Sequence, residues 1–332
     1  MKILLIAGAR PNFMKIAPLI HELGKYKRAA EFKVVHTGQH YDHEMSTLFF
    51  EQLEIPKPDI NLEIGSDKHG AQTGKMLEGL ENEMLKISPD LVLSFGDTNS
   101  TLAACLAASK LNIASLHIEA GLRSFNRSMP EEINRIVADH TADLLFAPTS
   151  LAVNHLSNEG LANKTVLTGD IMADSVEFVQ SKIKGNKHSN YPYFLLTLHR
   201  PYNVDDPKRL SLLFSQLAQL NNQVIFPIHP RTKKVIESGS IKIPDNFKLI
   251  PPQGYIEFQS LVKFAEKIIT DSGGLQKEAY IAAKPCITLR SETEWVETIE
   301  AGWNILLDIE DNQLVNKINS FQPDAKHPDL YG

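Results

Sequence analysis

The sequence predicts an α/β protein with two doubly wound, parallel-sheet domains. At 332 residues the chain is long for one core, so two domains of about 150 residues each are expected. Short β-branched runs alternate with helical patterns almost from end to end. These runs are continuously apolar, which is typical of strands in a parallel sheet that is covered on both faces.

The first expected domain covers residues 1–171. The strand "KILLIAG" precedes an amphipathic helix from Pro11 to Lys25. The same order then repeats, with "FKVVHTG" before a helix over 44–53, "LVLSFGD" before "STLAACLAASK", "ASLHIEAG" before "PEEINRIVADH", and "DLLFAPT" before a helix ending at Glu159. The domain is expected to end just after "TVLTGD".

The second expected domain covers residues 172–332. A helix over 173–184 leads into "KGNKHSNYP", a polar stretch with Gly and Pro that predicts a linker near 184–192. The strand–helix order then restarts through "YFLLTLH", "DPKRLSLLFSQLAQL", "QVIFPIHP", "NFKLIPP", "EFQSLVKFA", "KIITDS", a helix from Gly274, and "PCITLR". Two such domains are expected to face each other across a cleft lined by the carboxyl ends of both sheets.

Composition narrows the functional class. The 34 basic and 40 acidic side chains give a net charge of −6, which argues against a nucleic-acid binder. The start is broken by Gly8 and Pro11, unlike a signal peptide, and no run of about 18 apolar residues predicts a membrane span. Cys105 and Cys286 lie in apolar runs and are expected to be buried thiols. We see no metal-ligand spacing, and a cytoplasmic enzyme fits these features.

Polar residues follow several first-domain strands at the point where each strand ends. They are Arg10, the pair Gln39 and His40, Asp97, and Glu119. Packing alone does not require so many, although strand-end solvation and local capping remain the alternative.

Arg10 and the proline after it suit the first turn of a helix, where a guanidinium and backbone N–H groups together favour an anion. Lys15, about one turn later, could contribute to the same site. Asp97 or Asn99 could instead simply cap the helix that starts at Ser100.

The motif "MPEEINR" adds further charge. Glu131 and Arg135 are four residues apart and share a helix face, so a surface ion pair worth about 0.3 kcal/mol is the alternative reading. The apolar pattern beyond them packs this helix on the sheet, so we expect Asp97, Glu119 and Glu131 to converge. Carboxylates held close together raise the pKa of one member, which supplies an acid and a base near neutral pH.

In the second domain, "TDSGGLQKEA" is the most informative motif. A strand ends at Asp271, and Ser272, Gly273 and Gly274 open a helix that carries Glu278. Glycines let backbone N–H groups approach a diphosphate, and an acidic residue one turn later can bind ribose hydroxyls. The motif therefore indicates a nucleoside diphosphate.

Histidines differ in their surroundings. His199 directly follows a buried strand, which favours a functional role, while the position of His229 leaves both readings open. His155, His188 and His327 fit solvated positions.

Taken together, the motifs resemble those of the non-hydrolysing UDP-N-acetylglucosamine 2-epimerases, which have the GT-B fold of two Rossmann-like domains. The motifs are "GARPNFMKIAPL", "HTGQHYD", "GDTNSTLAA", "HIEAGLRS", "MPEEINR", "LTLHR", "TDSGGLQKEA" and "EAGWN". The resemblance implies that a base takes the C2 proton while UDP leaves C1 in an anti elimination, and that the glycal re-adds UDP after reprotonation on its other face. It also implies no cofactor, a UDP-N-acetylhexosamine substrate, a homodimer, and a role in making surface-polysaccharide precursors.

The family's functional positions can be carried over one by one. Acid and base roles fall on Asp97, Glu119 and Glu131, with Arg135 and His199 supporting them. Glu131 or Asp97 is expected to handle the C2 proton, while His199 and Arg10 steady the departing UDP. The expected nucleotide contacts are Arg10, Lys15, Gln253, Phe258 (against uracil), Ser272, Gly273, Gly274 and Glu278.

Two departures from the family pattern stand out. Many members read "TERPE" where this chain has "TEWVE", with Trp295 at a position where an arginine often contacts ligand. This variant resembles the branch that acts on UDP-2,3-diacetamido-2,3-dideoxyglucuronic acid, which is the alternative substrate. Members also usually continue past Tyr331 and Gly332 into a helix, so a shortened, less stable chain is expected. A UDP-sugar-dependent GT-B glycosyltransferase is the alternative of another class, but it would not need three carboxylates facing C2.

Overall fold

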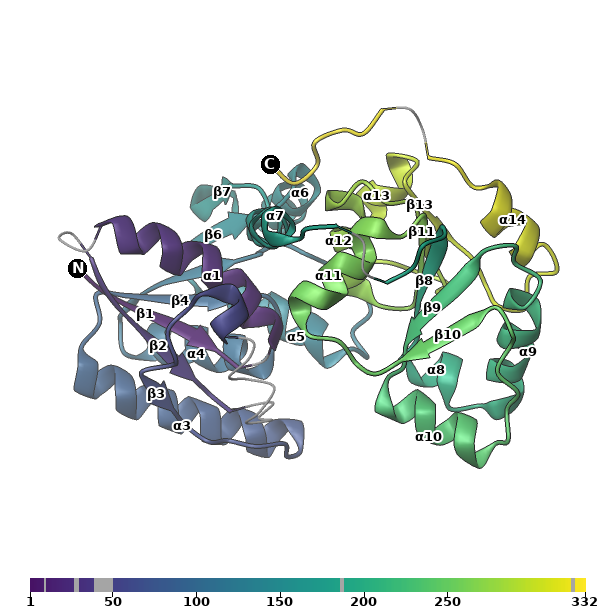
Figure 1. Cartoon of the computed structure of the whole chain (residues 1–332). Coiled ribbons are helices and arrows are strands. Elements are labelled where there is room, and N and C mark those ends of the chain that lie inside the picture. Colours follow the sequence, from purple (N-terminus) through teal and green to yellow (C-terminus); the bar gives the residue numbers. More distant parts are fainter. Residues whose placement is uncertain (9, 27–29, 39–49, 186–187, 324–325) are drawn as a thin grey trace. The chain divides into compact units, whose positions relative to one another are not determined.

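A computed structural model describes residues 1–8, 10–26, 30–38, 50–185, 188–323 and 326–332. The chain forms two compact units (Figure 1): unit 1 is Met1–Phe178 with Leu330–Gly332, and unit 2 is Val179–Asp329. Each unit is built on one parallel sheet with helices between its strands, so the expected α/β fold class is confirmed. In the ranges given, no helix combines the length and apolar character needed to cross a membrane.

Unit 1 contains a seven-stranded sheet of order β3-β2-β1-β4-β5-β6-β7, in which every pair is parallel. The order reverses between β1 and β4, and ligands of open α/β sheets bind at the carboxyl ends of the strands at such a switch point. The strands are β1 (Lys2–Ala7), β2 (Glu31–His36), β3 (Ile60–Asn61), β4 (Leu91–Phe95), β5 (Ala114–Ile118), β6 (Leu144–Ala147) and β7 (Thr165–Leu167).

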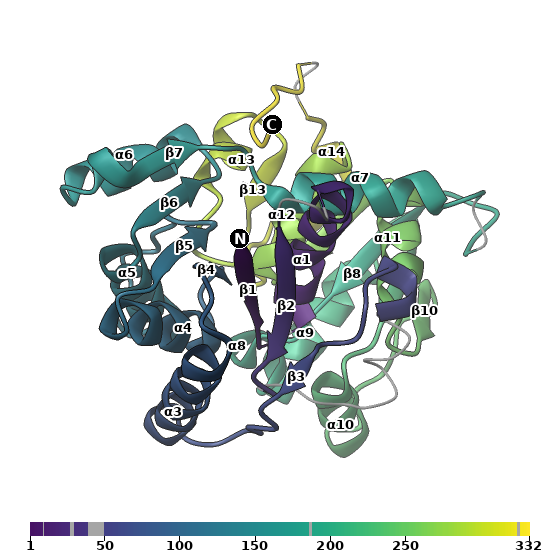
Figure 2. The same cartoon turned by 90° about the vertical axis from the view of Figure 1, so that its left-hand side faces the viewer.

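Helices cover both faces of this sheet. Figure 2 shows α3, α4 and α5 on one face and α1 on the other. The alanines of α4 let α3 approach closely, and Met76, Leu80 and Met84 fill the contact. The helices are α1 (Arg10–Leu23), η1 (Gly24–Tyr26), α3 (His69–Ile87), α4 (Asn99–Lys110), α5 (Pro130–Thr141), α6 (Ser150–Asn158), η2 (Ala162–Lys164) and α7 (Ile171–Lys182).

Unit 2 repeats this plan with a six-stranded parallel sheet of order β10-β9-β8-β11-β12-β13, and its switch point lies between β8 and β11. Apolar clusters cover both faces of the sheet. Its strands are β8 (Tyr193–Thr197), β9 (Gln223–Pro227), β10 (Phe247–Ile250), β11 (Lys267–Thr270), β12 (Cys286–Thr288) and β13 (Asn304–Leu306). Its helices are α8 (Pro201–Val204), α9 (Pro207–Leu217), α10 (Pro230–Ser238), α11 (Tyr255–Phe264), α12 (Gly273–Ile281), α13 (Val296–Glu300) and α14 (Leu314–Ser320).

The chain passes between the units at two places. The first is between residues 178 and 179, inside α7, and the polar segment 184–192 then belongs to unit 2. The second lies just before Leu330, where the last three residues join unit 1. There the N–H of Asp170 donates to the Tyr331 carbonyl over 2.7 Å, and Tyr331 is buried.

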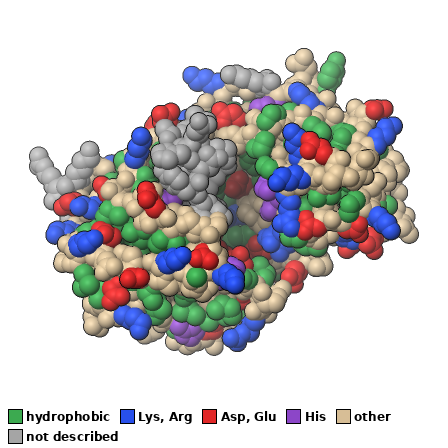
Figure 3. All heavy atoms as spheres, turned by 90° about the horizontal axis from the view of Figure 1, so that it is seen from below, with side chains coloured by type: hydrophobic (Ala, Val, Ile, Leu, Met, Phe, Trp, Pro, Cys, Tyr) green, Lys and Arg blue, Asp and Glu red, His purple; other side chains and the backbone are tan. Residues whose placement is uncertain are grey.

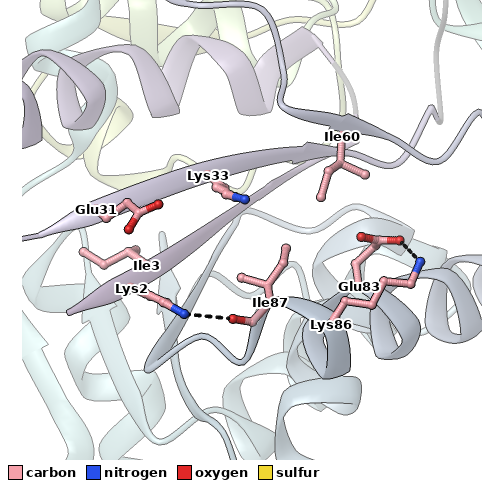
Figure 4. Close-up of a pocket in the computed structure, with 8 residues that line it drawn as sticks. All are labelled: Lys2, Ile3, Glu31, Lys33, Ile60, Glu83, Lys86 and Ile87. Atoms are coloured by element: carbon pink, nitrogen blue, oxygen red, sulfur yellow. Dashed lines mark hydrogen bonds and ion pairs between the residues drawn. The ribbon is translucent and has the colours of Figure 1, made fainter.

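Figure 3 shows Lys and Arg side chains as well as Asp and Glu side chains among the described surface residues. A pocket of about 370 Å³ lies in unit 1 at the amino ends of β1 and β2 (Figure 4), far along the strands from their carboxyl ends. None of the expected site residues is among the described residues that line it, which are Lys2, Ile3, Glu31, Lys33, Ile60, Glu83, Lys86 and Ile87.

Candidate functional site

In unit 1, Asp97 follows β4 at the switch point and forms an ion pair with Arg135 of α5. The Arg135 Nη2 and Nε atoms lie 2.6 Å and 3.1 Å from Asp97 Oδ2. The Asp97 side chain is 34% exposed whereas that of Arg135 is 6% exposed, so the carboxylate can meet a ligand while its partner is fixed. Asn134 also donates to the Asp97 carbonyl over 2.9 Å. α5 therefore fixes both the side chain and the backbone of Asp97.

Glu119 follows the neighbouring strand, β5, and lies beside the Asp97 turn. Its carboxylate is buried in an ion pair with Lys15 of α1. Gly96 makes this arrangement possible, because a Cβ on it would lie 2.8 Å from Lys15 Nζ and 3.1 Å from Glu119 Oε2. Glu119 itself has a φ of +69°, a left-handed conformation that costs a non-glycine residue about 1 kcal/mol. Asp97, Glu119, Lys15 and Arg135 are thus brought together at one edge of the sheet.

The two adjacent glutamates of α5 have different surroundings. Glu131 is exposed on the first turn of the helix. Arg135 pairs with Glu132 instead, with Nη1 2.8 Å from Oε2. Glu132 also accepts the backbone N–H groups of Ser124 and Phe125, each over 2.9 Å. Burial disfavours its charge, but these hydrogen bonds and that of Arg135 hold the pKa of Glu132 below its ordinary value.

Next to these residues, four ionisable side chains contact one another in series. His117 of β5 contacts Asp139 of α5, Asp139 also contacts Arg123, and Arg123 forms a bidentate pair with Glu159. The side chains of His117 and Asp139 are fully buried. Burial opposes the charge of Asp139, but the hydrogen bonds and charges of His117 and Arg123 lower its pKa below the ordinary value.

Three further first-unit expectations concern the loops after β1, β2 and β4. The cap of α4 is Thr98, whose hydroxyl accepts the N–H of Thr101, so the alternative reading of Asp97 or Asn99 as the cap does not hold. Arg10 begins α1, but its side chain lies outside what the structure describes. Gln39 and His40 also lie outside the described residues.

In unit 2, Asp271 at the end of β11 organises the turn after β8. Its carboxylate accepts the backbone N–H groups of His199 and Arg200, over 3.1 Å and 3.0 Å, and the amide of Asn203 over 3.2 Å. The Nδ1 atom of His199 lies 3.2 Å from Asp271 Oδ1. The side chain of His199 is 40% exposed, whereas that of Asp271 is fully buried. Asp271 therefore orients the His199 ring, as carboxylates orient histidines in acid–base sites.

Charge on Asp271 is favoured by these contacts. Burial acts against the ionised form, but the hydrogen bond and charge of His199, with the N–H of Arg200 and the amide of Asn203, lower the pKa of Asp271. His229, which also follows a strand of this sheet, caps α10 by accepting the N–H of Arg231 over 3.2 Å.

The start of α12 has the form expected of an anion site. Ser272 caps the helix, Gly273 is its first residue, and Gly274 is exposed with open space where a Cβ would be. A Cβ on Gly273 would collide with the carboxylate of Glu294, which Arg290 contacts over 3.0 Å. The first N–H groups of a helix favour negative charge, so this turn suits carboxylate or phosphate oxygens.

The remaining expected contacts of unit 2 lie on or near α11 and α12. Glu278 accepts the side-chain amide of Gln259 over 2.5 Å, which links α12 to α11. Phe258 packs at the edge of the core cluster beneath α11, and Gln253 precedes that helix with its amide 2.6 Å from the Pro251 carbonyl. Trp295 is buried, and the Lys277 ammonium lies 4.4 Å from its ring centre.

Both cysteines are buried thiols, as expected, and burial raises the pKa of Cys105 and of Cys286 to about 12. Sequence reasoning overlooked Glu132, Asp139 and His117 in unit 1 and the orienting role of Asp271 in unit 2. Asp271 had a visible signal, because it directly follows a strand and precedes the glycine turn.

Comparison with known proteins assigns the chain to a family. The family profile described as UDP-N-acetylglucosamine 2-epimerase matches residues 22–331. A Methanococcus maripaludis protein named UDP-N-acetylglucosamine 2-epimerase homolog is 49% identical over 335 residues, which cover 97% of this chain and 93% of that protein. The UDP-2,3-diacetamido-2,3-dideoxy-D-glucuronate 2-epimerase of Pseudomonas aeruginosa is 47% identical over 315 residues, which cover 92% of this chain and 88% of that protein.

Solved structures agree with the sequence comparisons. The crystal structure of Methanocaldococcus jannaschii UDP-GlcNAc 2-epimerase in complex with UDP-GlcNAc and UDP is similar, with a TM-score of 0.89 and 42% identity. The match covers 100% of this chain and 96% of that one. The chain therefore belongs to the UDP-N-acetylglucosamine 2-epimerase family of nucleotide-sugar 2-epimerases.

Proposed function

We propose that this protein interconverts UDP-N-acetylglucosamine and UDP-N-acetylmannosamine. The observation that carries the proposal is the cluster of Asp97, Glu119 and Arg135 at the carboxyl ends of β4 and β5, in a chain of this family. Removal of the weakly acidic C2 proton requires a positioned base, and its return on the other face requires a positioned acid.

Unit 1 would supply the acid–base chemistry. Asp97 is the better supported base, because Arg135 contacts only its Oδ2 atom and the side chain is partly exposed. Glu119 is buried against Lys15. It would therefore act on a substrate that binds at the carboxyl ends of the strands and excludes water from them. Glu131 is exposed one turn before Arg135 and remains the second candidate for the C2 proton.

Unit 2 would bind UDP. The start of α12, with Ser272, Gly273 and Gly274, offers backbone N–H groups to the diphosphate, and Glu278 would accept hydrogen bonds from the ribose. His199, oriented by Asp271, would stabilise the diphosphate as it leaves C1. Gln253 and Phe258 would contact uracil, and Arg10 and Lys15 would add positive charge.

A second sugar has specific support. Trp295 stands in the "TEWVE" motif, and a relative 47% identical to this chain is named UDP-2,3-diacetamido-2,3-dideoxy-D-glucuronate 2-epimerase. The same proton transfer would operate on that sugar, because the C2 proton and the UDP leaving group are shared. The alternative therefore changes the substrate and leaves the proposed roles of the residues unchanged.

The decisive test is incubation with UDP-N-acetylglucosamine in deuterated water, followed by NMR of the sugar. Deuterium at C2, a manno product and an intact UDP linkage are expected. A parallel reaction with the diacetamido uronate decides between the two sugars by comparison of kcat/KM. Release of free N-acetylmannosamine would indicate a hydrolysing enzyme, and failure to exchange deuterium into either UDP sugar would refute the proposal.

A further inference from the structure

His117 in β5 makes two hydrogen bonds that a neutral imidazole cannot make together. Its Nδ1 atom lies 2.7 Å from Asp139 Oδ1, and its Nε2 atom lies 2.7 Å from the Gly96 carbonyl oxygen. A carbonyl and an ionised carboxylate offer only lone pairs, so each contact needs a hydrogen from the ring. A neutral ring carries one such hydrogen, whereas the imidazolium carries two.

The opposite assignment, a protonated Asp139 that donates to a neutral ring, conflicts with the other side of that carboxylate. Asp139 Oδ2 accepts the Gly121 N–H over 3.1 Å and lies 2.8 Å from Nη2 of Arg123. A guanidinium at this distance favours the ionised form of Asp139. The charges then alternate from His117 through Asp139 and Arg123 to the partly exposed Glu159, so each of the three buried charges has an opposite neighbour, as burial requires.

These contacts converge on the backbone that carries the proposed acid–base residues. His117 holds the carbonyl of Gly96, the residue before Asp97, and Asp139 holds the N–H of Gly121, two residues after Glu119. Both turns contain left-handed backbone, with φ of +66° at Gly96 and +69° at Glu119. Glycine adopts this conformation without strain, whereas Glu119 keeps it only where surrounding contacts determine it.

We propose that His117 is a positioning residue whose ring donates from both nitrogens and so fixes the turns that carry Asp97 and Glu119. Its ring contacts the Gly96 carbonyl directly and reaches the Gly121 N–H through Asp139. It has no role as a proton donor to the sugar. Its catalytic consequence rests on the proposed function, because small displacements of an acid or base slow proton transfer strongly.

The protonation state can be measured without any substrate. The full chain, labelled with ¹⁵N at histidine, is expected to show one ring with hydrogens on both nitrogens at neutral pH, because each ring nitrogen of His117 faces an acceptor. The spectrum of His117→Gln, which lacks this signal, assigns it. A neutral His117, with one nitrogen bearing no hydrogen at neutral pH, would overturn the proposal.

The positioning role is tested by kinetics. His117→Leu removes both contacts and is expected to lower kcat about 100-fold, with KM and UDP affinity within about twofold of wild type. His117→Gln keeps one donor for the Gly96 carbonyl and is expected to recover part of this loss, to about 10-fold below wild type. If the leucine variant does not fold, the glutamine variant and the spectrum decide.

His140→Gln is the matched control, because His140 lies next to Asp139 on α5 and contacts Glu159 at the surface. Its kcat should match that of wild type. A kcat of His117→Gln equal to that of wild type, or a fall in UDP affinity as large as the fall in kcat, would contradict the positioning role. Wild-type protein that turned over no UDP-N-acetyl sugar would contradict only the proposed function, because the nitrogen spectrum would still report the charge on His117.

Discussion

The two units share the order of their central strands but differ in what they place at the switch point. In unit 1 the ends of β4 and β5 carry carboxylates, and each is held by a cation from a helix, as Arg135 holds Asp97 and Lys15 contacts Glu119. In unit 2 the end of β11 carries a buried carboxylate and then a glycine turn that opens α12. Partly exposed His199 lies beside it, in the turn after β8.

The two kinds of site therefore differ in the residues that follow the strands and not in the topology of the sheets. In both units the parallel sheet places the turns that follow its strands at the same end of the sheet, where the carboxyl ends of the strands lie. Paired carboxylates at that end suit proton transfer, whereas glycines and a helix start suit an anion. One fold, used twice in one chain, can therefore carry two different chemistries.

Of the substitutions considered for the two units, replacement of Asp97 in unit 1 is expected to have the largest effect. Asp97→Asn keeps the size of the side chain but removes the proposed base, so kcat should fall about 1,000-fold while UDP affinity is unchanged. Steady-state kinetics and calorimetry with UDP measure the two quantities. Asp90→Asn is the control, because Asp90 accepts the Lys2 N–H at the amino end of the same sheet. A parallel loss of UDP affinity would assign Asp97 to binding instead.

Replacement of Asp271 tests whether unit 2 depends on its buried carboxylate. In Asp271→Asn the N–H donors of His199, Arg200 and Asn203 would face a neutral amide in place of a carboxylate. The free energy of unfolding should therefore fall by about 3 kcal/mol at neutral pH. The pKa of Asp271 lies below its ordinary value, so its ionised form stabilises the native state above about pH 4. That contribution is lost as the pH falls through the folded-state pKa.

Urea unfolding between neutral and acid pH checks this, and the wild-type and variant curves should converge in acid. Asp311→Asn is the control, because Asp311 pairs with Lys317 at the surface and its smaller effect should disappear in high salt. A constant difference between wild type and Asp271→Asn down to acid pH would contradict the assignment of the ionised form.

The smallest effect is expected at the glycine turn. Gly273→Ala places a Cβ against the Glu294 carboxylate, which must move at the start of α12, and UDP affinity should fall about 10-fold. Gly274→Ala has open space around its Cβ and should not lower the melting temperature, so any loss of UDP affinity there reports the ligand directly. Equal UDP affinity in wild type and both variants would remove α12 from the proposed diphosphate site.

Much of the fold could be predicted from the sequence, because continuous apolar strands occur only where both faces of a sheet are covered. Helix α3 was not predicted. Its buried face is a narrow stripe of residues four apart, and Gly70, Gly74 and Gly79 interrupt the pattern of helix-forming residues. Its packing against the alanines of α4, which no local pattern encodes, stabilises it.

The candidate site was predictable only in part. Polar residues just after strands are visible in the sequence, so Asp97, Glu119 and His199 could be singled out. The partner of Arg135 could not be chosen, because adjacent glutamates of α5 differ only in which one meets the N–H groups of the loop at Ser124. The contact between His117 and Asp139 joins a strand to a helix, and the two residues are 22 positions apart in the sequence, so no local pattern shows it.

The contact of residues 330–332 with the first unit also has a practical consequence. Because the Tyr331 carbonyl accepts the Asp170 N–H, and a Cβ on Gly169 would lie 2.7 Å from that oxygen, these three residues are a structural part of the first unit. A fragment of residues 1–178 would therefore lack this contact. Isolation of the first unit for spectroscopy would require residues 330–332 to be joined back through a flexible peptide.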